Sequence, residues 1–261
     1  MSRVRICRFA VAVATIVIAN AGPAIAQSGS HPRVEISANV GGSTGATFKE
    51  SESFPSYNET ATLTANHAVK TAVAFDVGGA VRIVPRFWVG VQYAMANATP
   101  SAAVTAQIPH PLLFNAPRTV SATVRNLAHH EHDAHVDLWY VVPVRALEVQ
   151  AMAGPTFFSL TQDFVTNMAV NETYPFDTAT FSGATTARAS GTALGFNAGV
   201  DISRQLTSHA AVGALVRYSR ADVKFDRQTV KAGGLEAGGG VRIRLSMQKR
   251  RRGAKPPVRA K

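Results

Sequence analysis

The segment 129–144, HHEHDAHVDLWYVVPV, decides the fold class. Every second residue from His129 to Asp137 is polar, whereas the residues between them become apolar from Ala134 onward. Successive side chains of a β-strand point to opposite faces of the sheet, so this alternation predicts a strand with one polar and one apolar face. The rest of the chain must indicate whether the apolar face meets a soluble core or lipid.

Seven further segments show the same two-residue alternation. They span residues 33–40, 69–82, 87–96, 147–154, 192–203, 210–219 and 235–245. The connections between the eight segments alternate strictly between long and short. The long connections are 41–66, 97–128 and 161–189, the connection 222–233 is intermediate, and a few residues, such as those around Pro85, make each of the others. An up-and-down antiparallel barrel, with tight turns at one end and large loops at the other, produces this pattern.

The length of the segments fits a membrane span made of strands. After the first 26 residues, the sequence contains no uninterrupted apolar stretch of the roughly 18 residues that a membrane helix needs. A strand of about ten residues, tilted by roughly 40°, rises about 25 Å, which is the height of the apolar band of an outer-membrane barrel. In lipid, only a closed barrel gives every strand a hydrogen-bonding partner. The sequence therefore predicts an all-β, eight-stranded antiparallel up-and-down transmembrane β-barrel.

This architecture assigns the polar face of each strand to a narrow lumen. The predicted lumen-facing polar residues carry both signs of charge and can pair with one another. They are Glu35, Asp76, Arg82, Glu131, Asp133, His135, Asp137, Glu148, Asp201, Arg217, Glu236, Arg242 and Arg244. Aromatic residues are candidates for the girdles at the two lipid–water interfaces. These candidates are Phe87, Trp139, Tyr140, Phe157, Phe158 and Tyr218.

Both ends of the chain differ from the predicted barrel. Three arginines, an apolar run over 9–19 and the small-residue pattern Ala24-Ile25-Ala26 predict a signal peptide over 1–26. The barrel is expected over 27–248, and residues 249–261 form a basic tail. The formal charge of +11 lies mostly in these two ends, so the nearly neutral body gives no reason to expect nucleic acid. Cys7, the only cysteine, precedes the predicted cleavage site, which leaves no disulfide chemistry to the mature chain.

Three glycine-rich strand endings resemble those of a known family. They are AMAGPTFF (151–158), AAVGALVRYSRA (210–221) and GLEAGGGVRIRL (234–245). Over about 33–245 the chain resembles the small outer-membrane β-barrel proteins of the OmpA/OmpX-like superfamily, in its broad outer membrane protein beta-barrel domain branch. One departure is that such barrels usually end with a terminal aromatic residue, whereas SMQKRRRGAKPPVRAK follows Leu245 here. The resemblance implies the fold and says nothing about an activity.

Three other readings of the sequence compete with this one. The first is a soluble periplasmic or secreted β-barrel that binds a small ligand inside. The second is a metal site in HHEHDAH (129–135), although three or four convergent ligands are needed and only local ones are visible. The third is a membrane-embedded enzyme with a serine nucleophile and a histidine base. Its candidate residues are His129 or His132 as the base and Ser121, Ser159 or Ser190 as the nucleophile.

The sequence thus predicts an exported protein of a Gram-negative-type outer membrane, in contact with outer-membrane lipid and monomeric. We expect a structural or surface-interaction role through the long extracellular loops, above all 97–128 and 161–189, where an extracellular ligand would bind. We expect no enzymatic activity, no cofactor and no bound metal, and no contact with nucleic acid.

Overall fold

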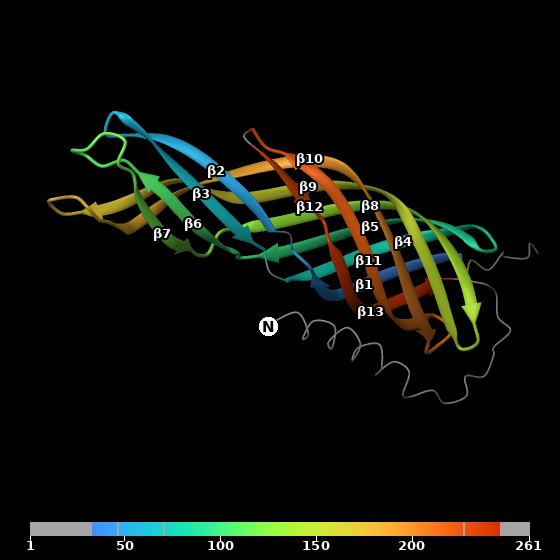
Figure 1. Ribbon diagram of the computed structural model, residues 1–261. Helices are drawn as coiled ribbons and strands as arrows, with labels where there is room; N and C mark the ends of the chain where they lie inside the picture. Colours follow the sequence, from blue (N-terminus) through green and yellow to red (C-terminus); the bar gives the residue numbers. More distant parts are fainter. Residues whose placement is uncertain (1–32, 46, 70, 227, 246–261) are drawn as a thin grey trace, which may run out of the picture.

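The computed structural model describes residues 33–245 except 46, 70 and 227 (Figure 1). The predicted signal peptide, 1–26, and the predicted tail, 249–261, lie outside the described residues. All regular elements of the described part are strands. They are β1 (Val34–Ser43), β2 (Thr47–Ser56), β3 (Glu59–Ala68), β4 (Ala72–Val84), β5 (Phe87–Ala98), β6 (Ser101–Ile108), β7 (Arg118–Val124), β8 (His129–Val144), β9 (Leu147–Glu172), β10 (Ala179–Gln205), β11 (Ala210–Lys224), β12 (Thr229–Ala232) and β13 (Leu235–Leu245). No helix in this part of the chain is long and apolar enough to cross a membrane.

The larger sheet has nine strands, and its antiparallel pairings return to their starting point. From β1 they run through β4, β5, β8, β9, β10, β11 and β13, and β13 pairs with β1 again. The short β12 pairs with the end of β11 alone. Eight strands therefore form a closed circuit of hydrogen-bonded neighbours. The prediction of an all-β antiparallel fold is confirmed.

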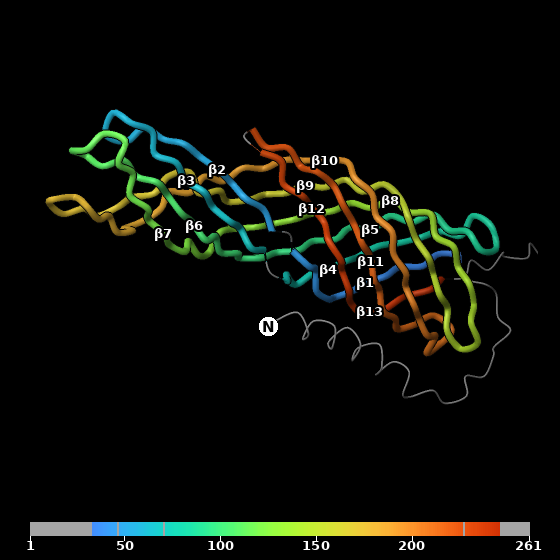
Figure 2. Tube along the Cα trace, viewed as in Figure 1, coloured from blue at the N-terminus to red at the C-terminus, as the bar shows by residue number. Residues whose placement is uncertain are grey.

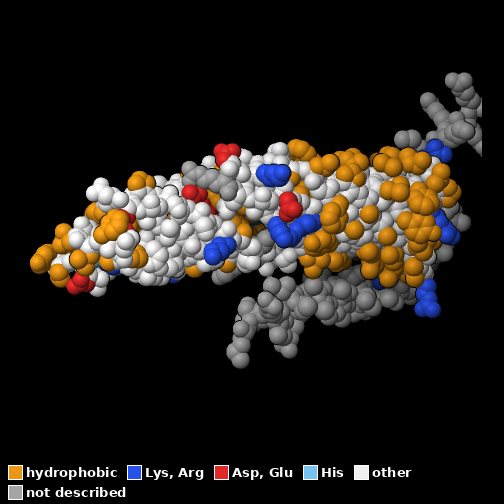
Figure 3. All heavy atoms as spheres, turned by 45° about the horizontal axis from the view of Figure 1, so that its top comes forward, with side chains coloured by type: hydrophobic (Ala, Val, Ile, Leu, Met, Phe, Trp, Pro, Cys, Tyr) orange, Lys and Arg blue, Asp and Glu red, His pale blue; other side chains and the backbone are white. Residues whose placement is uncertain are grey.

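Apolar side chains cover the outside of this circuit. The strand alternation places one side chain of each successive pair outward, and these outward residues are largely exposed. They include Ile36, Val40, Val73, Phe75, Val77, Val81, Val89, Val91, Tyr93, Val136, Leu138, Phe157, Leu194, Phe196, Val200, Ile202, Val216, Tyr218, Val241 and Ile243. On the face seen in Figure 3, hydrophobic side chains form a broad zone over the end of the molecule that contains the short turns. Of the predicted girdle residues, Trp139 and Phe158 do not belong to this surface, because they are buried.

The second sheet lies at the other end of the elongated molecule, in the order β2-β3-β6-β7 (Figure 1). One of its faces packs against the outer parts of β9 and β10 around a separate apolar core. The buried residues of this core are Ala61, Leu63, Ala65, Ala102, Val104, Ala106, Ile108, Val120, Leu127, Val165 and Met168. The two long connections that contain β2–β3 and β6–β7 are therefore folded structure with a core of their own.

The prediction that these connections are loops is therefore wrong. Residues 59–68 and 101–108 do alternate, as Ala61, Leu63 and Ala65 on one face illustrate. Alanine supplies most of the apolar face, and threonine much of the other, so the contrast between the faces is weak. Each of these strands buries only one face, against the β9–β10 hairpin. A weakly apolar face is therefore enough to form the core of this sheet.

The hairpin of β9 and β10 extends far beyond the circuit, where the sequence predicted a loop over 161–189 (Figure 2). With 26 residues at about 3.3 Å each, β9 is roughly 85 Å long, several times the height of a membrane's apolar band. Register shifts between Phe181 and Gly183 and between Thr185 and Thr186 interrupt the ladder. Opposite them, the consecutive residues Phe164 and Val165 are both buried. Such bulges break the two-residue period that the prediction relied on.

Replacing Leu63 by alanine should test whether the second sheet is an independent unit. Its fully buried side chain belongs to the outer core, so the Leu63→Ala variant should lose about 2–5 kcal/mol of local stability. We expect faster proteolysis between 47 and 124, with unchanged unfolding of the closed circuit. Thr62→Ala, on the exposed face of the same strand, is the control and should behave like the original chain. Simultaneous unfolding of both sheets in Leu63→Ala would contradict this independence.

Candidate functional site

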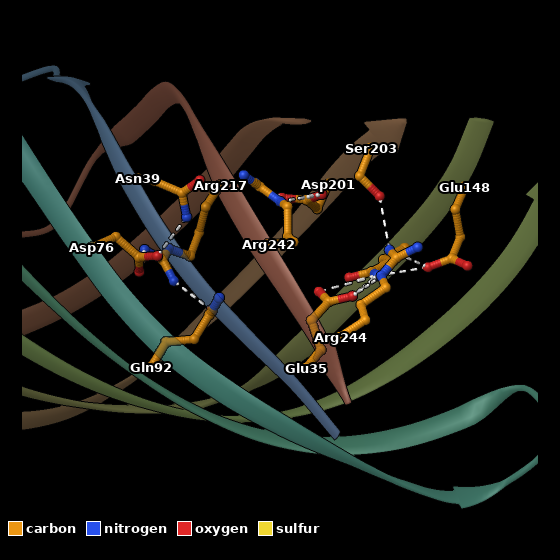
Figure 4. A network of polar contacts seen from close by, with 11 residues as sticks. Glu35, Asn39, Asp76, Gln92, Glu148, Asp201, Ser203, Arg217, Arg242 and Arg244 are labelled. Atoms are coloured by element: carbon orange, nitrogen blue, oxygen red, sulfur yellow. Dashed lines mark hydrogen bonds and ion pairs between the residues drawn. The ribbon is translucent and has the colours of Figure 1, made fainter. Parts of the chain in front are cut away.

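The thirteen polar residues predicted for the lumen point into the closed circuit or lie at its edge. Ten of them are buried: Glu35, Asp76, Glu131, Asp133, His135, Asp137, Asp201, Arg217, Arg242 and Arg244. Arg82, Glu148 and Glu236 are half-buried. The set contains eight carboxyl groups and four guanidinium groups. Most of the charges are brought together in two groups around the arginines of β11 and β13 (Figure 4).

Arg217 of β11 is the centre of the first group. Its guanidinium donates to Asp76 of β4 at 2.6 Å, to Gln92 of β5 at 2.7 Å and to Glu236 of β13 at 2.9 Å. Asn39 of β1 donates to the same aspartate at 2.8 Å. Because β11 and β4 are not neighbours in the circuit, the Arg217 side chain spans the interior and joins opposite walls (Figure 4).

Arg242 and Arg244 of β13 form the second group. Arg244 donates to Glu35 at 2.7 Å, to Glu148 of β9 at 2.6 Å and to Ser203 of β10 at 2.9 Å. Arg242 is ion-paired with Asp201 of β10. Glu35 lies on the neighbouring strand β1, whereas the bonds to β9 and β10 join strands that are not hydrogen-bonded neighbours of β13. The fixed fork of the guanidinium group suits such multiple contacts better than a lysine would.

An apolar cluster fills the interior near the short turns. It contains Ala80, Trp88, Trp139, Val141, Met152 and Leu215. Gly90 makes room for it, since a Cβ atom there would lie 3.0 Å from the indole ring of Trp139. Together with the arginine groups, this cluster leaves the interior occupied by side chains. Such packing is expected of a circuit of eight strands, which is barely wide enough for its own side chains.

Replacing Arg217 by alanine should strongly destabilise the circuit. The substitution leaves Asp76 buried without its counter-charge, and breaking a buried pair in this way costs about 3–5 kcal/mol. We expect a lower urea midpoint for the folded form in detergent micelles. Arg125→Ala, which removes an exposed arginine, should leave the midpoint unchanged. Equal midpoints for both variants would show that the pairing in Figure 4 contributes nothing.

The histidines of 129–135 are held apart from one another. His129 and His135 are buried inside, whereas His130 and His132 are only half-buried, on the opposite face of β8. Each binds a separate neighbour through Nδ1: His129 binds Gln162, His130 binds Asn97, His132 binds Tyr93 and His135 binds Thr156. Within the described ranges, no group of three or more His, Cys, Asp or Glu residues is placed to hold a metal ion.

Two of the three serines considered for catalysis, and both histidines, are bonded to other residues. Ser121 bonds to Thr105 at 3.2 Å, and Ser190 bonds to Thr161 at 2.9 Å. Ser159 lies opposite His132 in the β8–β9 ladder, and the Nδ1 atom of that histidine is occupied by Tyr93. The geometry of the described residues therefore brings none of these serines into a bonded pair with His129 or His132.

Asp163 fixes the point where the outer part of β9 leaves the circuit. Its carboxylate accepts from the Arg188 side chain of β10 at 2.8 Å and from the Ala128 amide at 2.8 Å. The hydrogen bond from Arg188 lowers the pKa of the Asp163 carboxyl below its usual value. A carboxyl whose pKa is lower in the folded state stabilises the fold at pH values above its unfolded-state pKa of about 3.9. This stabilisation is lost as the pH falls through the folded-state pKa.

We therefore expect Asp163→Asn to lower the melting temperature at pH 7, by about 2 °C for a pair this close to the surface. The difference from the original chain should shrink as pH falls below about 4. Thermal unfolding in micelles at pH 7 and pH 3 measures both values. Asp226→Asn, which alters an exposed carboxylate in the turn between β11 and β12, is the control. A difference that is the same at both pH values would contradict the pairing.

A groove lies beside this point on the outer part of the molecule, with a volume of about 250 Å³. Phe164 and Phe225 line it, together with Glu50 of β2. The buried Glu50 carboxylate accepts from the Val165 amide at 3.2 Å and bonds to His67 at 2.8 Å. The sequence alone did not predict this Glu–His pair, because Glu50 lies in the segment 41–66, which was expected to be a loop, and His67 has no partner beside it in the sequence.

The far end of the molecule is a compact cap, which we call the distal cap and define as residues 57–59, 109–118 and 172–177. Arg118 joins two of its segments by donating to Glu172 at 2.5 Å, to the Pro109 carbonyl at 2.6 Å and to the Phe176 carbonyl at 2.9 Å. The Tyr57 hydroxyl donates to the same glutamate. This bond raises the pKa of Tyr57, so the phenol remains a donor at neutral pH. Two of these bonds join residues more than 50 positions apart, so no local pattern in the sequence predicted the cap.

No family model matches the chain. No curated protein matches its sequence. Solved structures that it resembles include Neisserial surface protein A, with 13% identity and a TM-score of 0.43 over 81% of this chain and 97% of that one. The attachment invasion locus protein Ail of Yersinia pestis has 13% identity and a TM-score of 0.35 over 80% and 99%. The outer membrane protease OmpT from Escherichia coli has 10% identity and a TM-score of 0.39 over 84% and 99%.

These likenesses concern the arrangement of the chain and extend to no activity or ligand. The structures that this chain resembles are small outer-membrane β-barrel proteins, the class that the glycine-rich strand endings indicated.

Proposed function

We propose that the chain is a bacterial outer-membrane protein whose eight-strand circuit is a transmembrane β-barrel, with a structural or surface-interaction role. The observation that carries this proposal is the inverted polarity of the circuit. Its outward side chains are apolar, and charged residues such as Arg217, Arg242 and Asp201 are buried inside. A soluble barrel would bury the apolar set and expose the charges. Lipid is the solvent in which the observed arrangement is stable.

Aromatic pairs support a position for the membrane along the barrel. The ring centroids of Phe87 and Tyr140 lie 5.1 Å apart next to the short turns. Those of Phe196 and Tyr218 lie 6.3 Å apart toward the long connections. Amphipathic rings favour the two lipid–water interfaces. The short turns then face the periplasm, and the sheet β2-β3-β6-β7 stands outside the cell together with the outer part of the β9–β10 hairpin.

The filled interior supports a role other than that of a wide pore. Arg217 and Arg244 each span the interior, and an apolar cluster follows near the turns. The outer structure is the part with a surface free for partners. The circuit closes within one chain, so a second copy is not needed to pair with any of the circuit's strands. This closure supports a monomer.

Single cysteines would test this orientation. On a Cys7→Ser background, Thr123→Cys places a thiol on the exposed face of β7, and Leu206→Cys places one in the turn between β10 and β11. In intact cells, a membrane-impermeant maleimide should label Thr123→Cys at least 10-fold more than Leu206→Cys. Permeabilising the outer membrane should make the labelling equal.

The unboiled protein from the outer-membrane fraction should also migrate differently from the boiled one, because a closed barrel resists unfolding in detergent. Equal labelling of both cysteines in intact cells would contradict the orientation. A soluble protein without a heat-dependent shift would overturn the membrane assignment and leave a soluble β-barrel as the better reading.

A further inference from the structure

The distal cap presents large apolar side chains to water at the end of the molecule farthest from the short turns. Leu112 is 63% exposed, Leu113 56%, Phe114 76% and Tyr174 77%. Figure 3 shows hydrophobic side chains at this tip, separated from the barrel zone by a mostly polar stretch. Apolar groups gathered in this way on a surface mark a place where another molecule is bound.

The apolar tip is held in one shape from beneath. The His110 ring accepts hydrogen bonds from the Leu112 and Leu113 amides, both at 3.1 Å. The Asn115 amide, on the other side of the tip, donates to Glu59 at 3.3 Å. Arg118 fixes the base of the loop. Because the tip is ordered before it meets a partner, binding does not have to order it.

The chemistry of the tip indicates what it meets. The loop between β6 and β7, PHPLLFNAP (109–117), contains no lysine, arginine, aspartate or glutamate. Tyr57 and Tyr174 flank it on the two neighbouring turns, and both are exposed. Leucine and phenylalanine favour the acyl region of a bilayer, whereas tyrosine favours the headgroup level. The tip also projects outward. A lipid bilayer can accept such a projecting apolar loop without a pocket of matching shape.

We propose that the distal cap inserts Leu112, Leu113 and Phe114 into the surface of a facing lipid bilayer. This inference rests on the proposed function, since a transmembrane barrel holds the cap away from its own membrane. We expect one tip to bind a bilayer about as strongly as a single acyl chain does. Such a chain binds weakly and reversibly, with an association constant of roughly 10⁴ M⁻¹. Many copies on one cell surface would strengthen the attachment by avidity.

The test uses the full chain in nanodiscs, mixed with phosphatidylcholine vesicles and separated by flotation. The original chain should float with the vesicles, and protein-free nanodiscs should not. The triple variant Leu112→Ser, Leu113→Ser and Phe114→Ser should reduce the floating fraction about 10-fold. Leu206→Ser removes an equally exposed leucine from the turn at the opposite end and should float like the original chain. Because the tip is uncharged, 0.5 M salt should change the floating fraction less than twofold.

A second variant separates rigidity from apolar content. Arg118→Ala keeps the tip residues but releases the base of the loop, and it should reduce flotation to a level between the original chain and the triple variant. The inference is overturned if the original chain stays at the bottom, or if the triple variant floats as well as the original chain. A heat-dependent mobility shift, measured on every sample, reports the barrel separately. Its absence from the original chain would overturn the proposed function, whereas its presence without flotation overturns the bilayer inference alone.

Discussion

Closure of the strand circuit is the constraint on which the rest of the structure depends. β1 pairs with β4 along one edge and with β13 along the other, so the first and last strands of the described chain satisfy each other. Within the circuit every strand has a neighbour on both sides, which is the condition for placing a sheet in lipid. The outward residues can be apolar only because the backbone beneath them needs no further partner.

Closure also creates a narrow interior in which charges must find partners across the barrel. Arg217 and Arg244 meet this requirement by contacting strands that the sheet does not place beside them. A buried ion pair is weak evidence for stability by itself, because desolvation offsets much of the attraction. Here the pairs tie opposite walls of the circuit together and occupy its interior.

The closed circuit supports an outer structure with a core of its own. The β9–β10 hairpin continues past the circuit, and the second sheet packs on it through its own core around Leu63 and Val165. Asp163 and Arg188 join the two hairpin strands near the start of this extension. The cap at its far end is held by its own hydrogen bonds, and its exposed leucine and phenylalanine side chains stand on this fixed base.

The sequence by itself determined the all-β class, the positions of the eight strands of the circuit and the face to which each polar residue belongs. These features follow from an alternation that short-range geometry imposes on every strand. It did not predict the second sheet, whose alanine-rich faces differ little from their threonine-rich opposites, nor the full length of β9 and β10, where bulges interrupt the period. Only the tertiary structure decided that Arg217 reaches Asp76, that Glu50 bonds to His67 and that Arg118 gathers the cap. The two residues of the Arg217 pair are 141 positions apart, and no local pattern records which residues a closed sheet will bring face to face.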